Sequence, residues 1–226
     1  MEIKNLNQYI YRINRLSIKN FSKQKFLVFD LEATGFDVKR EYITQIGCAP
    51  IINGKIKIKD KFSSFIYSPK NIPAKISRLT GITNQQVKTA PNLGVILQKL
   101  WSLYYDFIWT AQCGFEFDFP IMQNNVKRLG ITYFNPKTID TKVIFAYLHP
   151  EIDAIFSTDF LKKYYNVKFS DLKRHDALSD SILIGRVLQK MLNDFIRVKG
   201  NDLIIKRPII IKKFVPKPLK YSTTNS

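Results

Sequence analysis

The chain has 226 residues, of which 45% are hydrophobic, and this composition excludes a disordered protein while allowing one substantial domain or two small ones. The apolar runs are too short to span a bilayer, and no secretory signal is recognisable. The formal net charge of +18 indicates a polyanionic partner. Nucleic acid is the first candidate and an anionic membrane surface the second, although an AT-rich genome would also enrich lysine.

Residues 1–25 form a basic segment in which Glu2 is the only acid. Apolar residues recur there at helical spacing, which predicts a helix packed on the main domain. A mitochondrial targeting helix and an arm that faces nucleic acid are alternatives. The apolar positions are Ile3, Leu6, Tyr9, Ile10, Ile13 and Leu16.

The chain becomes strand-like from residue 26. Residues 26–31, 42–51 and 56–66 are three apolar runs, and the turn Asn53-Gly54 separates the last two. Asn-Gly between apolar runs is a strong hairpin signal, so we expect these strands to form an antiparallel meander.

Helices and strands alternate in the following part of the chain. This order predicts an α/β fold with a mixed five-stranded sheet, in which strands one to three are antiparallel, strands four and five are parallel, and helices cover both faces. We expect helices over 73–79, 92–104, 120–129, 141–148, 158–165 and 177–196, and strands over 106–110 and 138–140.

The segment after residue 196 is rich in lysine and proline, and its last six residues are polar. We expect a mobile basic tail over residues 197–226, which adds affinity for a phosphate backbone in the functional interpretation. The expected organisation is therefore an extension over 1–25, a main domain over 26–196 and this tail. Cys48 and Cys113 lack metal-ligand spacing and are expected to be reduced thiols of an intracellular protein, cytoplasmic or nuclear, with a mitochondrial location left open.

Two carboxylates follow the first apolar run at the spacing of one strand face. Asp30 and Glu32 are two residues apart, so their side chains point the same way on a strand. Like charges held together repel unless a cation lies between them, and Mg²⁺ prefers carboxylate oxygens. Alone, the pair is better explained as a solvated strand end.

Two further clusters bring acidic residues and a histidine to helix starts. Asp118 precedes Pro120, which suits the first turn of a helix, so Asp118 by itself is best explained as an N-cap. His175 and Asp180 lie five residues apart where the last long helix begins. A lone histidine is more often structural than catalytic.

Together, Asp30-x-Glu32, Asp118, His175 and Asp180 resemble the DEDDh (DnaQ-like) family of 3′-to-5′ exonucleases, and the chain is most similar to the three-prime repair branch. The resemblance covers about residues 26–192 and implies a ribonuclease H-like fold. It implies that the four acidic residues hold two Mg²⁺ ions, for which Mn²⁺ can substitute, and that Asp30 is shared by both. It also implies that His175 is the general base, a task suited to an imidazole with an ordinary pKa of ~6.5.

The resemblance further implies a seat for the terminal nucleotide. Leu79, Phe36 and Phe117 could equally be core residues. The nucleotide would rest on Ala33 and Thr34, with Phe36, Leu79 and Phe117 around its base and sugar.

Two local features separate this chain from other members. Asp176 stands where the tyrosine-type branch has its catalytic tyrosine, which selects the histidine type. Gln112-Cys113-Gly114 replaces the His-Asn-Gly common in relatives, which leaves the positioning of the scissile region open.

The expected function is removal of nucleotides from DNA 3′ ends, with a preference for single-stranded or frayed ends. Alternatives of the same fold are an exoribonuclease and a polymerase proofreading subunit. An alternative of another class is an inactive nucleic-acid-binding module. The expected partner is nucleic acid, DNA before RNA, with no membrane partner and a homodimer left open.

Overall fold

A computed structural model describes residues 2–214 of the chain. Its centre is a mixed sheet with the strand order β6-β5-β4-β8-β9, in which β7 also pairs with β5. β4 is antiparallel to β5 and parallel to β8, and β8 is parallel to β9. The predicted fold class is therefore confirmed. The strands are β4 (Phe26–Ala33), β5 (Ile43–Ile52), β6 (Lys55–Ile56), β7 (Phe62–Phe65), β8 (Ile108–Ala111) and β9 (Lys137–Asp140).

The predicted third strand is divided into two short pieces. A 3-10 helix, η2 (Ile58–Asp60), separates β6 from β7, and both pieces pair with β5. The predicted hairpin turn is present, because Asn53 and Gly54 both have positive φ, of 54° and 69°. A tight hairpin turn with both central residues in this conformation favours Asn-Gly.

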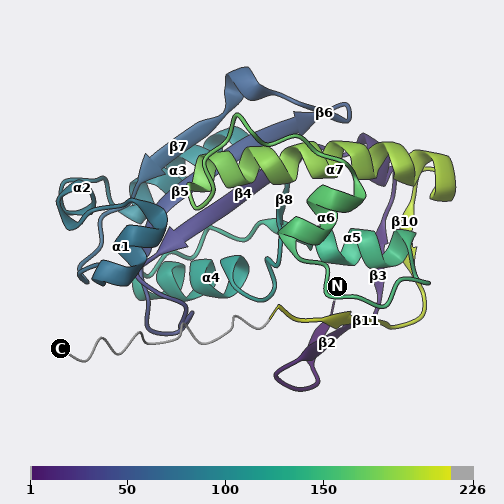
Figure 1. Cartoon of the computed structure of the whole chain (residues 1–226), viewed down its shortest axis with the longest axis horizontal. Coiled ribbons are helices and arrows are strands. Elements are labelled where there is room, and N and C mark those ends of the chain that lie inside the picture. Colours follow the sequence, from purple (N-terminus) through teal and green to yellow (C-terminus); the bar gives the residue numbers. More distant parts are fainter. Residues whose placement is uncertain (1, 215–226) are drawn as a thin grey trace, which may run out of the picture.

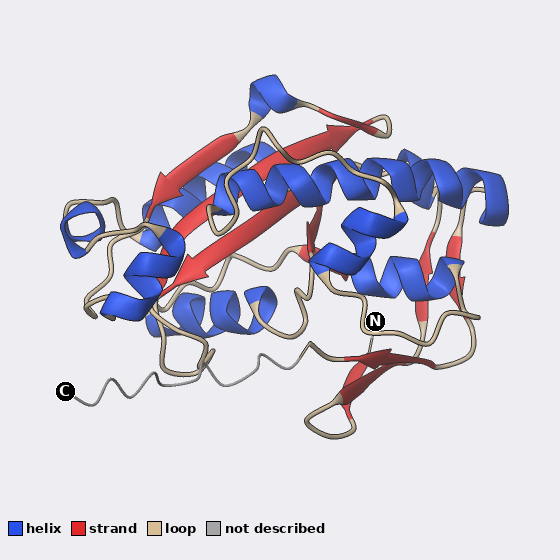
Figure 2. Ribbon diagram, viewed as in Figure 1, coloured by secondary structure: helices blue, strands red, loops and turns tan. Residues whose placement is uncertain are grey.

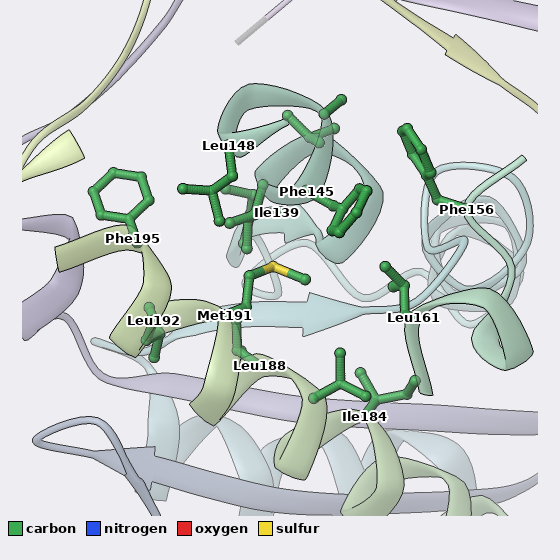
Figure 3. Packing of buried hydrophobic residues seen from close by; sticks show 14 of the residues in the cluster. Ile139, Phe145, Leu148, Phe156, Leu161, Ile184, Leu188, Met191, Leu192 and Phe195 are labelled. Atoms are coloured by element: carbon green, nitrogen blue, oxygen red, sulfur yellow. The ribbon is translucent and has the colours of Figure 1, made fainter. Parts of the chain in front are cut away.

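Seven α-helices are found among residues 2–214, and they cover both faces of the sheet (Figures 1 and 2). One apolar core lies between the sheet and helices α5 and α7, and Figure 3 shows α7 residues such as Leu188 and Met191 facing Ile139 and Phe145. A second core lies between the other face and helices α3 and α4. The helices are α1 (Ala74–Thr80), α2 (Asn84–Lys88), α3 (Leu93–Tyr104), α4 (Asp118–Arg128), α5 (Thr141–Leu148), α6 (Thr158–Tyr164) and α7 (Ala177–Lys199).

Local sequence explains most helix ends. α1 ends at Gly81, whose φ of 78° is the left-handed conformation common at helix C-termini. The short helix α2 was not predicted from the sequence, although Thr83 and Gln86 form a capping box at its start. α4 begins at Asp118 rather than at residue 120.

The predicted N-terminal helix is wrong. The segment forms strands β1 (Ile3–Asn5), β2 (Ile10–Ile13) and β3 (Leu16–Ile18), followed by the 3-10 helix η1 (Phe21–Lys23). Tyr11 and Ile13 are buried while their neighbours are half-buried, so the burial follows the two-residue period of a strand. The helical spacing of the apolar residues was coincidental, because β2 finds its strand partners elsewhere in the chain.

Those partners come from the segment predicted to be a mobile tail. β10 (Leu203–Ile205) pairs with β3, and β11 (Ile209–Lys212) pairs with β2. The prediction of a mobile tail is therefore wrong for residues 203–212, which backbone pairing holds in strands. The lysine and proline content of the segment gave no sign of these partners. The polar residues 221–226 lie outside the described part of the chain. No helix among residues 2–214 is both long enough and apolar enough to cross a membrane.

Candidate active site

The site begins on β4, where the two-residue period separates acids from core residues. Asp30 and Glu32 are half-buried on one face of the strand, whereas Leu31 and Ala33 are buried in the core that contains α3 and α4. The β4 face predicted from the spacing of the two carboxylates is therefore present. The other face supports the strand through apolar packing.

Strand β5 brings the start of α7 onto this face. Gly47 pairs with Asp30, and a Cβ added at Gly47 would lie 2.2 Å from the backbone of Ala177 and Leu178. Only a residue without a side chain allows the helix to approach so closely. The absent side chain of Gly47 thus brings α7, which carries Asp180, onto the strand that carries Asp30.

Gln45 fixes the same helix end by hydrogen bonds. It is buried opposite Glu32, its amide nitrogen donates to Asp176 (3.0 Å), and its amide oxygen accepts from the Ala177 N–H (3.1 Å). Asp176 also accepts from the Ser179 N–H (2.9 Å) as the N-cap of α7. Gln45 and Gly47 were not identified from the sequence, since nothing local marks a strand residue as the docking point of a helix 130 residues later.

Three of the sequence-predicted residues meet where β4 and α7 adjoin. One ligand atom each of Glu32, His175 and Asp180 lies within 4.8 Å of the other two. The His175 N–H donates to Asp180 Oδ2 (3.0 Å), and the Arg174 guanidinium pairs with Asp180 Oδ1. His175 has a φ of 60°, an uncommon conformation for a residue other than glycine. Arg174 was not singled out from the sequence, although it directly precedes His175.

The carboxylates of the site raise one another's pKa. Burial raises the pKa of Asp30 well above its ordinary value, and repulsion from Asp118 and Glu32 adds to the effect. Burial raises the pKa of Glu32 to about 8, with Asp180 repelling it and Arg174 opposing the shift. The pKa of Asp180 is raised by burial against the opposing charge of Arg174. Such a cluster has less positive charge nearby than its ionised form requires.

Asp118 belongs to this cluster and has an unused acceptor. Its side chain is 3% exposed, and its pKa is raised by burial and by repulsion from Asp140 and Glu32. Oδ1 of Asp118 is buried without a hydrogen-bond partner among the described residues. A buried carboxylate oxygen without a partner, beside three other carboxylates, fits a site for a hard divalent cation. The four acids are therefore the residues that could hold metal.

The segment before Asp118 contains Gln112 and Cys113 in place of His-Asn, and hydrogen bonds hold Gln112 in the core. Gln112 donates to the Phe156 carbonyl (2.6 Å) and accepts from the Thr141 hydroxyl, so its amide is engaged in the core. Cys113 has a φ of 57°, a conformation that asparagine adopts more readily than cysteine. The departure from His-Asn-Gly therefore leaves the turn in place and turns Gln112 to a structural use.

The residues expected around the terminal nucleotide differ in accessibility. The Ala33 side chain is buried in the core, and the buried Thr34 hydroxyl donates to Glu41 and accepts from the Tyr42 N–H (3.0 Å). Glu41 in turn pairs with Lys70 (2.7 Å). Neither Ala33 nor Thr34 presents a free side chain, so a contact there would involve backbone.

The three expected apolar contacts are not equivalent. Phe36 is 54% exposed and Leu79 is 40% exposed, so neither is a core residue. Phe117 is half-buried and packs against the core beneath α4. The exposed side chains of Phe36 and Leu79 are therefore available to a substrate, whereas Phe117 is only partly so.

Comparison with known proteins identifies the family. The family model described as Exonuclease (RNase_T) matches residues 27–188, which is more than half of the chain. The chain is 29% identical over 195 residues to the DNA polymerase III PolC-type protein of Caldanaerobacter subterraneus, covering 84% of this chain and 13% of that protein. It is 27% identical over 169 residues to the DNA polymerase III subunit epsilon of Aquifex aeolicus, covering 75% and 81%.

The share of the PolC-type relatives that is matched is small. A second PolC-type protein, from Clostridium perfringens, is 29% identical over 165 residues, and the chain covers 11% of its length. The chain therefore spans only about a tenth of the PolC-type relatives, and their remaining parts have no counterpart in the match.

Solved structures show the same fold. The nuclease domain of 3′hExo, a DEDDh family member bound to rAMP, has a TM-score of 0.67 at 17% identity, covering 82% of this chain and 98% of that one. Exonuclease X in complex with 5′ overhanging duplex DNA has a TM-score of 0.57 at 20% identity, covering 74% and 91%. The chain belongs to the exonuclease family, among its DEDD, DnaQ-like 3′-to-5′ exonucleases.

Proposed function

We propose that the protein is a metal-dependent 3′-to-5′ exonuclease that removes nucleotides from DNA 3′ ends, with a preference for single-stranded or frayed ends. The observation that carries the proposal is the convergence of Glu32, His175 and Asp180, whose ligand atoms lie within 4.8 Å of one another beside the half-buried Asp30 and the buried Asp118. Groups whose pKa is strongly raised by burial and by neighbouring charges cluster at functional sites.

Each residue of the cluster has a proposed role. Asp30, Glu32, Asp118 and Asp180 would hold two Mg²⁺ ions, or Mn²⁺ in their place, which neutralise the phosphodiester and acidify a water. His175 would take the proton of the attacking water at its imidazole. Its backbone N–H holds Asp180, so the proposed base and a proposed ligand are fixed to each other.

Arg174 has a proposed role in the protein before metal binds. Its guanidinium pairs with Asp180 and lowers the repulsion that Asp30, Glu32 and Asp180 would otherwise suffer. The same positive charge would attract an incoming phosphate once metal neutralises the carboxylates.

The proposed seat of the terminal nucleotide combines backbone and apolar contacts. We place the nucleotide against the backbone at Ala33 and Thr34, with Phe36, Leu79 and Phe117 around its base and sugar. The exposure of Phe36 and Leu79 supports this placement. Apolar packing on a base gives grip without reading sequence, which suits an exonuclease.

DNA is favoured over RNA by the names of the sequence relatives described above, which are DNA polymerase III polypeptides. The fold does not decide the matter, because similar structures include a complex with histone mRNA stem-loop and a complex with single-stranded DNA. An exoribonuclease therefore remains the second candidate of the same fold.

Two finer assignments also belong to the proposal. The motifs resemble the three-prime repair branch, whereas the relatives described above are PolC-type and epsilon proteins, which favours a polymerase-associated proofreading role as the alternative. The exonuclease domain over residues 26–196, a homodimer and an intracellular location stay predictions from the sequence.

Digestion of labelled oligonucleotides tests the proposal. Purified protein with Mg²⁺ or Mn²⁺ is expected to release mononucleotides from the 3′ end of DNA, faster from single strands than from blunt duplexes. His175→Ala is expected to lower the rate by at least about a hundredfold, as removal of a general base does. Asp180→Ala is expected to lower the rate at least as much, because it removes a proposed metal ligand. A wild-type protein that binds DNA but releases no nucleotide from DNA or RNA would support the inactive binding module instead.

A further inference from the structure

The two ends of the chain build one basic surface. Residues 2–25 and 200–214 carry ten lysine and arginine residues and two acidic ones. β2 pairs with β11 and β3 pairs with β10, so these charges from opposite ends of the sequence lie on adjoining strands. Figure 1 shows these four strands together, beside α5 and the C-terminal end of α7. We call the outward side of β1, β2, β3, β10 and β11 the terminal surface.

Strand register decides which residues face outward. Tyr11, Ile13 and Ile211 are buried in the core, so the alternating positions on β2 and β11 point away from it. Arg12 lies opposite Lys4 on one side and Ile210 on the other, which makes a row across three strands. The row presents the exposed Lys4, the half-buried Arg12 and the exposed apolar side chain of Ile210.

A pocket of about 330 Å³ lies on the two-stranded part of the terminal surface. Arg15, just before β3, and Lys206, just after β10, line the pocket. Ser17 of β3, which pairs with Ile204 of β10, also lines it. Two cations and a hydroxyl are the groups that bind a phosphate diester in nucleic-acid complexes.

These cations are free to bind an anion. Within residues 2–214, two of the ten, Lys25 and Lys212, pair with a carboxylate. Arg15 and Lys206 have no hydrogen-bond or ion-pair partner among the described residues, and both are exposed. Unpaired cations gathered on adjoining strands indicate a polyanion as the partner.

Two exposed aromatic rings accompany the charges. Tyr9 is 58% exposed and Phe214 is 51% exposed. They come from neighbouring backbone, because the Lys213 N–H donates to the Tyr9 carbonyl (2.7 Å). Exposed rings beside cations bind unpaired bases by stacking, whereas a duplex keeps its bases covered.

The terminal surface is also connected to the candidate active site. The Phe214 N–H donates to Glu116 (2.7 Å), which is two residues from Asp118. A strand whose 3′ end lies at the carboxylate cluster could therefore continue past this loop onto the terminal surface.

We propose that the terminal surface binds the phosphate backbone and bases of a single-stranded nucleic acid upstream of the 3′ end that is being degraded. This inference rests on the proposed exonuclease function and extends it to a second binding region. Arg15 and Lys206 hold phosphate, and Tyr9 and Phe214 stack on bases.

Substrate length separates this surface from the reaction centre. The test compares single strands of about 5 and about 30 nucleotides, since only the longer strand reaches a second region. Arg15→Glu/Lys206→Glu is expected to raise the KM for the long strand about tenfold, because two phosphate contacts are lost. The kcat and the KM for the short strand are expected to stay unchanged. The slope of log KM against log salt concentration for the long strand is expected to fall by about 1.4.

A matched charge reversal serves as the control. Lys59→Glu/Lys61→Glu changes the net charge equally at exposed positions on and after η2, beside β6 at the far side of the molecule from β11 (Figure 1). It is expected to change the long-strand KM by less than about twofold. Equal effects of the two double variants would overturn the proposal, because the general field of a basic protein would then explain them.

Binding measured without catalysis separates the two proposals. Fluorescence anisotropy with EDTA reports affinity even if no nucleotide is ever released, so a failed exonuclease assay does not hide the terminal surface. Tyr9→Ala/Phe214→Ala is expected to lower the affinity for the long single strand and to leave the affinity for a duplex of equal length unchanged. Unchanged oligonucleotide affinity in both variants overturns the proposal, and loss of binding to anionic phosphatidylserine vesicles in its place would assign the surface to membranes.

Discussion

Replacing Lys142 with methionine is expected to destabilise the protein by about 3–5 kcal/mol, because it leaves a buried carboxylate without its counter-ion. Lys142 lies on α5 with a side chain that is 0% exposed, and its Nζ is 2.5 Å from Oε1 of Glu116, which is 9% exposed. The same Nζ donates to the Lys212 carbonyl on β11 (2.6 Å). Methionine fills much of the same volume, so the loss comes from the charge and the hydrogen bonds.

The magnitude translates into a measurable change in thermal stability. A domain of this size loses about 2–4 °C of Tm per kcal/mol, so Lys142→Met is expected to lower Tm by roughly 6–20 °C. Circular dichroism during heating measures the loss.

The second partner gives the decisive comparison. Glu116→Gln in the Lys142→Met background removes the uncompensated charge, so the double variant is expected to recover about 2 kcal/mol or more of the loss. Double-mutant analysis of urea unfolding measures this coupling. A Lys142→Met protein within about 0.5 kcal/mol of wild type, or a double variant whose losses simply add, would refute the reasoning.

The ion pair also supports the candidate active site. Glu116 precedes Asp118 by two residues and accepts from the Phe214 N–H, so it ties the loop that carries Asp118 to the end of β11. Folded Lys142→Met protein is therefore expected to need more Mg²⁺ for half-maximal activity, and the double variant is expected to need less than the single one. Equal Mg²⁺ requirements in wild type and variant would limit the pair to a purely stabilising role.

Two further predictions concern the site itself. Gly47→Ala places a methyl group 2.2 Å from the backbone of Ala177, so α7 must shift. Activity is expected to fall more than tenfold, because a displacement of Asp180 by about 1 Å lowers the rate by about tenfold or more. A Gly47→Ala enzyme with wild-type rate and Mg²⁺ requirement would contradict this. Without metal, stability is expected to fall as the pH rises from about 5 to about 8, because the raised pKa of Glu32, about 8, makes the folded state bind more protons than the unfolded state. Mg²⁺ competes with those protons, so its increase in Tm should be larger at pH 8 than at pH 5; an equal increase at both would argue against a metal site here.

Periodic local patterns allowed much of the fold and site to be predicted. The two-residue period of β4 places Asp30 and Glu32 on one face, and the Asn53-Gly54 turn fixes the hairpin, because both depend on backbone geometry within a few residues. The convergence of His175 and Asp180 with Glu32 was expected only from the resemblance to a known family. Spacing alone could not show that α7 returns to β4.

Tertiary structure decided the partners of each segment. The apolar residues of β2 recur at helical spacing, which predicts a helix. Its strand partner, β11, lies about 200 residues away, so no local signal indicates the strand. Nothing in the local sequence marks Gly47 and Gln45, which contact the start of α7 in the folded chain. Lys142 resembles a surface lysine in sequence but is buried against Glu116 and β11. Which residues share a strand or helix face follows from the backbone period, so the order of residues along the chain is enough to predict it. Only the folded chain decided which faces meet, since contacts between distant segments depend on packing that no local window contains.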